Sequence, residues 1–286
     1  MRKKLRNFIS KIPILKSILS NAPRVSVVRL SGVLSPNQGG MPNRDTLNFE
    51  NVESLLEDAY EAPNLKAVAL IINSPGGTPA QAALIANKIV TLSKQNKVKT
   101  YAFIEDVAAS GGYWIACAAH EIHVQPSSII GSIGVVSAGF GFDAFIHKHG
   151  IQRRVYTAGD HKTMLDPFQK ENPSDIKRLK DIQKQLHQQF IDWVKSCRGN
   201  KLNSTDKKLF NGDIWLGTQA IDLGLVDGLS DMKSLMQKKF GKNTKFMPFS
   251  MSKGFLSSLI GSKHRIPDDL LETLENHAKW NALLQR

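Results

Sequence analysis

Apolar residues in the first half of the chain change repeatedly between two spacings. Runs rich in valine, isoleucine and alanine are typical of strands, and they occupy residues 25–30, 66–73 and 98–104. The run at 66–73 is nearly all apolar, as in a strand that is buried on both faces. Spacings of three and four residues, typical of helices, occur at residues 51–62 and 80–92. This alternation predicts right-handed βαβ units and a largely parallel sheet.

A long polar helix is predicted for residues 173–197. Its apolar side chains recur at helical spacing, at Ile176, Leu179, Ile182, Leu186, Phe190 and Val194. Beyond residue 240 the composition shifts toward serine, lysine and methionine, and a last helix opens at Pro267. We therefore expect three parts, which are a leader at 1–24, a folded domain at 25–240 and a C-terminal appendage at 241–286.

The composition places few further limits on the class of protein. The 286 residues are 41% hydrophobic and 22% charged, which suits one large α/β domain or two modest ones. The two cysteines, Cys117 and Cys197, lie in separate apolar segments without a CxxC spacing. Neither a disulfide framework nor a zinc site is therefore indicated, and we expect no metal and no cofactor.

Positive charge is concentrated in the leader. The chain has a formal net charge of +13, and residues 1–24 hold seven basic residues and no acidic one. The apolar residues of this leader recur at helical spacing, which predicts a basic amphipathic helix. Such a helix suits an anionic membrane surface or, equally, packing on the domain or on a partner. Lys11 and Lys16 interrupt the apolar run, so neither a cleavable signal peptide nor a transmembrane helix is expected. We expect a peripheral membrane or cytoplasmic protein that binds no nucleic acid, because the basic residues are not interleaved with aromatic stacking residues.

Two glycine-rich turns follow predicted strands. The first is N73-S-P-G-G77, which lacks the Lys-Ser/Thr of a phosphate loop. The second is A109-S-G-G-Y113, where Ser110 precedes a helix and is either an N-cap or a nucleophile. In a parallel sheet both turns lie at the carboxyl edge, where ligands bind. Backbone N–H groups that converge from two strands can form an oxyanion hole.

A serine nucleophile needs a general base, and spacing alone leaves several candidates. The candidate histidines are His120, His123, His147, His149 and His161, and a candidate lysine, Lys162, follows the last of them. Lysine has an unperturbed pKa of about 10.4, so a neutral amine at pH 7 requires a shift of about three units. Burial of the amine can supply such a shift.

Four motifs, in order, resemble the signal peptide peptidase A family of serine peptidases, the S49 group. They are N-S-P-G-G, A-S-G-G-Y, G131-S-I-G-V135 and G-x-x-K-x-x-x-D-P-F at residues 159–168, with a late G224-L-V-D-G228 turn. The resemblance covers roughly residues 25–230. One copy of the motif set implies the half-length form, with the spiral α/β fold of the caseinolytic protease subunit and the crotonases.

The resemblance also implies roles for single residues. Ser110 would be the nucleophile, Lys162 the general base and Ser132 the serine that orients the lysine. The oxyanion hole would be formed by the backbone N–H groups of Gly77 and Gly111, with Gly76 assisting. Half-length members are expected to form rings in which neighbouring subunits share a site.

The expected reaction is hydrolysis of peptide bonds through an acyl-enzyme. The expected substrates are signal-peptide remnants or membrane-associated peptides with small residues near the cut. Two other functions stay open. A crotonase-type acyl-CoA enzyme uses a similar oxyanion hole without a Ser/Lys pair, and a catalytically inactive membrane scaffold could keep the same fold.

Overall fold

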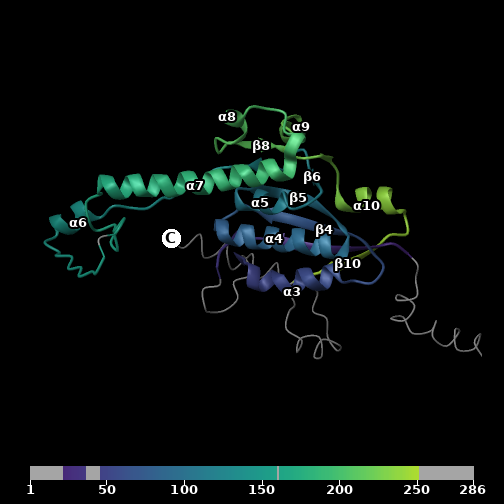
Figure 1. Ribbon diagram of the computed structural model, residues 1–286, viewed down its shortest axis with the longest axis horizontal. Coiled ribbons are helices and arrows are strands. Elements are labelled where there is room, and N and C mark those ends of the chain that lie inside the picture. Colours follow the sequence, from purple (N-terminus) through teal and green to yellow (C-terminus); the bar gives the residue numbers. More distant parts are fainter. Residues whose placement is uncertain (1–21, 37–45, 160, 251–286) are drawn as a thin grey trace, which may run out of the picture. The chain divides into compact units, whose positions relative to one another are not determined.

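The computed structural model describes residues 22–36, 46–159 and 161–250. Its main sheet has the strand order β10-β1-β4-β5-β6-β9, and neighbouring strands along this path pair in parallel (Figure 1). The strand bounds are Arg24–Ser31 for β1, Leu65–Ser74 for β4, Lys99–Ala109 for β5, Glu121–Val124 for β6, Gly228–Leu229 for β9 and Lys245–Phe249 for β10. The predicted α/β fold with a largely parallel sheet is confirmed.

The strand β5 is long enough to pair with two strands on the same side. Its first part pairs with β6, and its last three residues pair in parallel with β7, Ile129–Gly131. The strand β8, Ile214–Leu216, then pairs with β7 in antiparallel orientation. This fork places the end of β5 beside Gly131. A separate small sheet pairs β2, Val33–Leu34, with β3, Thr46–Leu47.

Helices connect these strands, and proline and asparagine mark where two of them begin. The helix bounds are Phe49–Tyr60 for α3, Pro79–Asn96 for α4, Gly111–Ala116 for α5, Asp143–Lys148 for α6, Pro173–Arg198 for α7, Asp206–Leu209 for α8, Gly217–Asp222 for α9 and Met232–Phe240 for α10. Proline at the first helical position of α4 and α7 has no N–H to leave unpaired. The Asn172 side chain caps α7 by accepting from the Ser174 N–H.

Alternate residues of β4 face two different hydrophobic layers. Val68, Leu70 and Ile72 pack in the larger core with residues of α3, α4 and α5. Ala67, Ala69 and Ile71 face the opposite side, in a smaller core that includes Met236 of α10. Both faces of the sheet are therefore covered, which explains the nearly unbroken apolar run of β4.

The elements expected within the described ranges are present, and the structure lengthens several of them. The strand expected at 98–104 continues to Ala109, and the helix expected at 80–92 continues to Asn96. The strand β10 lies beyond the expected boundary at residue 240, where it pairs with β1, and the compact unit extends to Phe249. The edge position of β10 tolerates Pro248, which obscures the strand in the sequence.

Two expectations concern residues outside the described ranges. Most of the basic leader and the helix expected after Pro267 fall there. Within the described ranges, no helix combines the length and hydropathy required to cross a bilayer.

Residues 136–172, here called the arm, connect the short segment that follows β7 to the start of α7. The arm contains α6 and lies at the amino-terminal end of α7 (Figure 1). Apart from residue 160, it is described throughout. Phe142 donates its backbone N–H to the Pro167 carbonyl, and the Phe142 ring stacks on Phe168 at 5.6 Å between centroids. These contacts hold the two ends of the arm sequence together.

Candidate active site

Ser110 occupies a strained backbone position between β5 and α5. Its φ of 51° and ψ of −123° are unusual for a residue with a Cβ, and such conformations cost about 1–3 kcal/mol. The Ser110 N–H donates to the Gly131 carbonyl at 2.8 Å, and the Ser110 carbonyl accepts from the Tyr113 and Trp114 N–H groups. Ser110 is at the N-cap position, but its side chain makes no capping hydrogen bond. Its hydroxyl is therefore free for another role.

The turn that follows β4 is held by backbone contacts with Leu34. The Leu34 N–H donates to the Gly76 carbonyl at 2.8 Å, and the Thr78 N–H donates to the Leu34 carbonyl at 2.9 Å. A Cβ at Gly77 would lie 2.1 Å from that carbonyl oxygen. A Cβ at Gly76, where φ is 98°, would lie 2.8 Å from the Ser110 Cβ. Only glycines allow the turn to approach both Leu34 and Ser110.

Two backbone N–H groups near Ser110 have no hydrogen-bond partner among the described residues. They belong to Gly77 and to Gly111, the first residue of α5, and both glycines line the same pocket as Ser110. The Gly76 N–H differs, because it donates to the Ser74 hydroxyl oxygen at 3.2 Å. Gly77 and Gly111 thus offer donors to a ligand, and Gly76 allows close packing.

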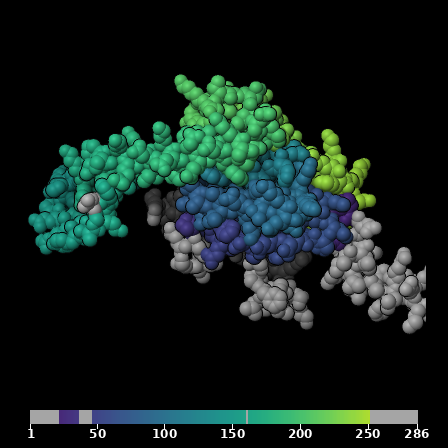
Figure 2. Space-filling view, viewed as in Figure 1, coloured from purple at the N-terminus to yellow at the C-terminus, as the bar shows by residue number. Residues whose placement is uncertain are grey.

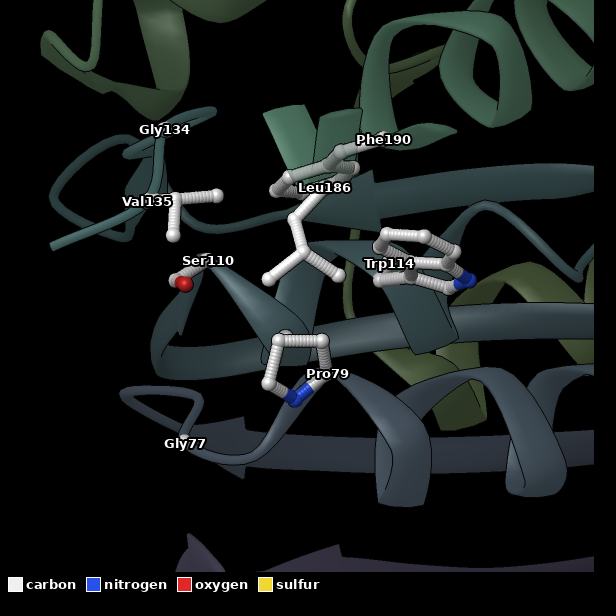
Figure 3. Close-up of a pocket in the computed structure, with 9 residues that line it drawn as sticks. Gly77, Pro79, Ser110, Trp114, Gly134, Val135, Leu186 and Phe190 are labelled. Atoms are coloured by element: carbon white, nitrogen blue, oxygen red, sulfur yellow. The ribbon is translucent and has the colours of Figure 1, made fainter. Parts of the chain in front are cut away.

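A small pocket opens beside the Ser110 hydroxyl (Figure 3). Its apolar walls come from separate parts of the chain, namely Pro79, Trp114, Val135, Leu186 and Phe190. The Trp114 ring stacks on Phe190 with centroids 4.8 Å apart. The cavity is about 20 Å³, close to the 10–15 Å³ that a single water requires. The pocket therefore admits a group about the size of a methyl.

Ser132 lies in the segment that follows β7, next to the residue that contacts Ser110. Gly131 and Ser132 both have positive φ, at 108° and 52°. The Ser132 N–H donates to the Asp213 carbonyl at 2.7 Å, whereas its hydroxyl makes no hydrogen bond within the described part of the chain. The structure thus brings Ser132 near Ser110 through the Ser110–Gly131 backbone contact.

Lys162 is not among the residues that line this pocket. It is exposed on the arm, and the adjacent His161 lies 3.0 Å from Arg178 in the early part of α7. Arg178 precedes the pocket residue Leu186 by eight positions, or about 12 Å along a helix. Ser110 and Lys162 are thus separated within one chain.

Asp166, close to Lys162 in sequence, is engaged in its own turn. Its carboxylate accepts from the Phe168 N–H at 3.0 Å and from Arg153 at 2.9 Å. The hydrogen bond from the Phe168 N–H, together with Arg153, lowers the pKa of Asp166 against the opposing effect of desolvation. The Asp166 carboxylate is therefore occupied within the turn that contains Pro167.

The histidine candidates lie elsewhere. His147 and His149 are exposed at the end of α6, and His123 stacks on Phe103 at 5.7 Å. The His120 ring accepts from the Thr100 N–H, and desolvation with nearby Lys99 lowers its pKa. These four histidines do not line the pocket beside Ser110.

The late glycine turn has a structural role away from the pocket. The buried guanidinium of Arg198, at the end of α7, donates to the Gly224 carbonyl and to the Asp227 carboxylate. Asp227 also accepts from Lys201 and from the Ile122 N–H. The sequence pattern did not identify these partners, nor Leu34 and Trp114 near the pocket. Leu186 and Phe190 were recognised only as helix-stripe residues.

The family model described as Peptidase family S49 matches residues 92–243. Over 232 residues, the chain is 48% identical to the Na(+)/H(+) antiporter NhaA of Brucella abortus (strain 2308), covering 81% of this chain and 31% of that protein. It thus spans less than a third of that relative. This chain is also 32% identical over 236 residues to a protein of Buchnera aphidicola subsp. Baizongia pistaciae that is named as the protease SohB. That alignment covers 82% of this chain and 66% of the Buchnera protein.

A solved structure of the 1510-N membrane-bound stomatin-specific protease, as a mutant in complex with a substrate peptide, has a similar fold. The TM-score is 0.50 and the identity 16%, and the alignment covers 84% of this chain and 96% of that chain. At this level of identity the likeness supports the fold alone.

Proposed function

The chain belongs to peptidase family S49, and from this premise we propose that it is a serine endopeptidase with Ser110 as nucleophile and Lys162 as general base. The main supporting observation is the strained Ser110 turn beside two unpaired backbone N–H groups, those of Gly77 and Gly111. A tight turn with a purely structural role has no need of both features.

In the proposed reaction, the neutral Lys162 amine takes the proton of the Ser110 hydroxyl as its oxygen attacks the peptide carbonyl carbon. The negative charge then develops on the carbonyl oxygen, where the Gly77 and Gly111 N–H groups donate hydrogen bonds. The C–N bond breaks as the lysine ammonium gives its proton to the leaving amine. Water then hydrolyses the acyl-enzyme by the same proton transfers in reverse.

We propose that the lysine of each site comes from a second copy of the chain. The separation of Lys162 from the pocket along α7 supports this arrangement. The arm also exposes large apolar side chains, with Val136 87%, Phe140 82% and Tyr156 91% exposed. Exposed apolar groups of this size are typical of interaction surfaces. A neighbouring subunit that covers the arm would also desolvate the lysine amine, as a neutral base requires.

The proposed substrates are peptides with a small side chain immediately before the cut. The methyl-sized pocket beside Ser110 supports alanine, glycine or serine at that position. Signal-peptide remnants and membrane-associated peptides meet this requirement. A related chain of Enterococcus faecium, 28% identical over 256 residues with 87% of this chain and 74% of that one covered, is named as a signal peptide peptidase, SppA.

We also propose that the chain binds an anionic membrane surface at the edge of the sheet where the basic leader enters. Exposed Lys66, Lys99 and Lys245 lie at the starts of β4, β5 and β10. Because these strands are parallel to β1, their starts share one edge with Arg24. Basic residues next to the amphipathic leader suit anionic lipid headgroups.

The test of the proposed reaction is cleavage of alanine-containing peptides by the Ser110→Ala variant. We expect activity to fall by more than about a hundredfold, because an activated nucleophile is lost. A fluorophosphonate should label the wild type and fail to label this variant. The matched control is Ser127→Ala, which removes an exposed hydroxyl and should leave cleavage and labelling unchanged. A Ser110→Ala variant that retains activity would exclude Ser110 as the nucleophile.

Acyl-CoA turnover, measured beside peptide cleavage and fluorophosphonate labelling, separates the other two functions. A crotonase-type enzyme would bind and turn over an acyl-CoA, and an inactive scaffold would be neither labelled nor active. No contact in the described part of the chain favours either of these over a peptidase.

A further inference from the structure

Two separate segments form neighbouring walls of the pocket. Leu186 and Phe190 project from α7, whereas Gly134 and Val135 belong to the segment that follows β7 (Figure 3). Because the pocket is so small, its width depends on the spacing between these two segments. A change of one methylene group in size typically changes discrimination between substrates by about 10–200-fold.

One side chain ties the two walls together. The Nε2 atom of His187, on α7 between the two wall residues, lies 3.1 Å from the Ile133 carbonyl oxygen. A carbonyl can only accept, so His187 donates this hydrogen bond. Ile133 is fully buried and directly precedes the wall residue Gly134. This hydrogen bond, called the tie below, therefore joins two residues that are each adjacent in sequence to a residue lining the pocket.

The other hydrogen bonds of this segment do not reach α7. The Gly131 carbonyl accepts from the Ser110 N–H, the Ser132 N–H donates to the Asp213 carbonyl, and the Gly134 N–H donates to the Ser132 carbonyl. Among the described residues, His187 supplies the only hydrogen bond between α7 and residues 131–135. Without it, only apolar packing would fix the distance between the walls.

The two segments joined by this hydrogen bond are separated in sequence by the arm. It starts directly after Val135 and returns at Pro173, the first residue of the helix that carries Leu186 and Phe190. His187 closes the base of this long loop.

We infer that His187 is a specificity-determining residue that sets the width of the pocket and restricts the residue before the cut to small side chains. This inference rests on the proposed peptidase function. His187 does not contact the reacting atoms. It acts through the Ile133 carbonyl, which fixes the Gly134–Val135 wall against Leu186 and Phe190.

The test compares His187→Ala, His187→Phe and His187→Gln in the full-length chain. Phenylalanine keeps the volume of the ring but cannot donate, whereas the glutamine amide can donate from about the same reach along the side chain. The kcat/KM is measured for two peptides that differ only in alanine or leucine before the cut. Gln188→Ala is the control, because it removes an exposed amide whose only hydrogen bond to a described residue is to Asp192 on the same helix.

We expect the preference for alanine over leucine to fall about tenfold in His187→Ala and His187→Phe, and to stay within about twofold of wild type in His187→Gln and Gln188→Ala. A variant that is merely less stable would lose activity on both peptides by the same factor. An unchanged alanine-to-leucine ratio in His187→Phe would therefore overturn the inference.

Amide hydrogen exchange gives a readout that does not depend on cleavage. We expect faster exchange at residues 132–135 in His187→Phe than in His187→Gln. Equal exchange in these two variants would overturn the role of the hydrogen bond. If the wild type cleaves neither peptide but the exchange difference is present, the proposed peptidase function fails and the tie between the walls stands.

Discussion

At the scale of single residues, the backbone around Ser110 is specialised at several adjoining points. Ser110 itself has positive φ, and so do Gly76, Gly77, Gly131 and Ser132. At the two serines, Ser110 and Ser132, positive φ costs free energy and persists only where surrounding contacts fix it. Here the Ser110–Gly131 and Ser132–Asp213 hydrogen bonds do so. The serine hydroxyl therefore makes no helix-capping hydrogen bond and lies beside unpaired backbone N–H donors, an arrangement that suits nucleophilic attack.

The first prediction concerns the proposed base. Lys162→Arg should be as inactive as Lys162→Ala, because a guanidinium remains charged and cannot accept the serine proton. In the wild type, kcat/KM should rise with pH, because a larger fraction of the lysine is neutral at higher pH. Peptide cleavage between pH 6 and 10 measures both effects. Lys170→Arg, a change at another exposed lysine of the arm, should leave the pH profile unchanged.

An active Lys162→Arg variant would contradict the role of Lys162 as general base, and His147 and His149 would then be the next candidates. These two histidines share the arm with Lys162 and are also exposed.

At the scale of elements, α7 connects regions with different tasks. Its early part contacts the arm through Arg178, its middle lines the pocket, and its end is anchored by Arg198 on Asp227 and Gly224. Burial would raise the pKa of Asp227, but hydrogen bonds from Arg198 and Lys201 outweigh this effect and lower it. A well-anchored end allows the helix to hold the pocket wall in place.

The second prediction follows from this buried ion pair. Arg198→Met should reduce the free energy of unfolding by about 3 kcal/mol, because it leaves the Asp227 carboxylate without its main partner. Lys195→Met is the control, since it breaks the exposed pair with Asp206 and a cation–π contact with Phe210, and should cost about 1 kcal/mol, well below the loss in Arg198→Met. Urea unfolding at pH 7 measures both. Equal losses would contradict the importance of the buried pair.

The lowered pKa of Asp227 also gives a pH dependence. The unfolded chain binds the Asp227 proton more tightly than the folded chain, so the folded state gains stability as pH rises. This contribution is complete above the unfolded value of about 3.9 and is lost as pH falls through the lower folded value. The wild type should therefore lose more stability than Arg198→Met between pH 5 and pH 3. Parallel decreases would contradict the linkage.

The sequence predicted the elements that have strong periodicity, and it missed those defined by long-range contacts. The apolar run of β4 and the stripe of α7 could be recognised directly. The strand β10 could not, because five residues with a proline become a strand only when β1 is beside them. His187 is one polar residue on a polar helix, and nothing in its neighbours indicates that it reaches Ile133.

At the scale of the whole molecule, the pocket and the entry of the leader lie at opposite edges of the sheet. Ser110 follows the end of β5, whereas Arg24 and the edge lysines lie at strand starts. The ten residues of β4 separate these edges by about 33 Å. Binding of a membrane at the leader edge would leave the pocket accessible. In the proposed shared site Lys162 meets Ser110 across two chains, so neither the sequence pattern nor contacts within one chain give the geometry of that pair.

The third prediction tests the proposed membrane surface. Changing Lys66, Lys99 and Lys245 to glutamate should weaken binding to phosphatidylglycerol vesicles by roughly a hundredfold, because each lysine near such a surface contributes about 1 kcal/mol. The control changes the same number of charges on α7, at Lys177, Lys180 and Lys184, which are exposed elsewhere. Vesicle sedimentation at low salt measures binding. Equal losses in both triple variants would contradict a defined surface.

The most direct test of the shared Ser/Lys site is to mix Ser110→Ala chains with Lys162→Ala chains and allow subunits to exchange. In an equal mixture, half of the serines and half of the lysines are intact, so one site in four should contain both in a closed heterologous ring. Peptide cleavage should therefore recover to about a quarter of the wild-type rate, although each variant alone is inactive. If subunits exchange and the mixture stays inactive, Ser110 and Lys162 do not act across an interface between chains.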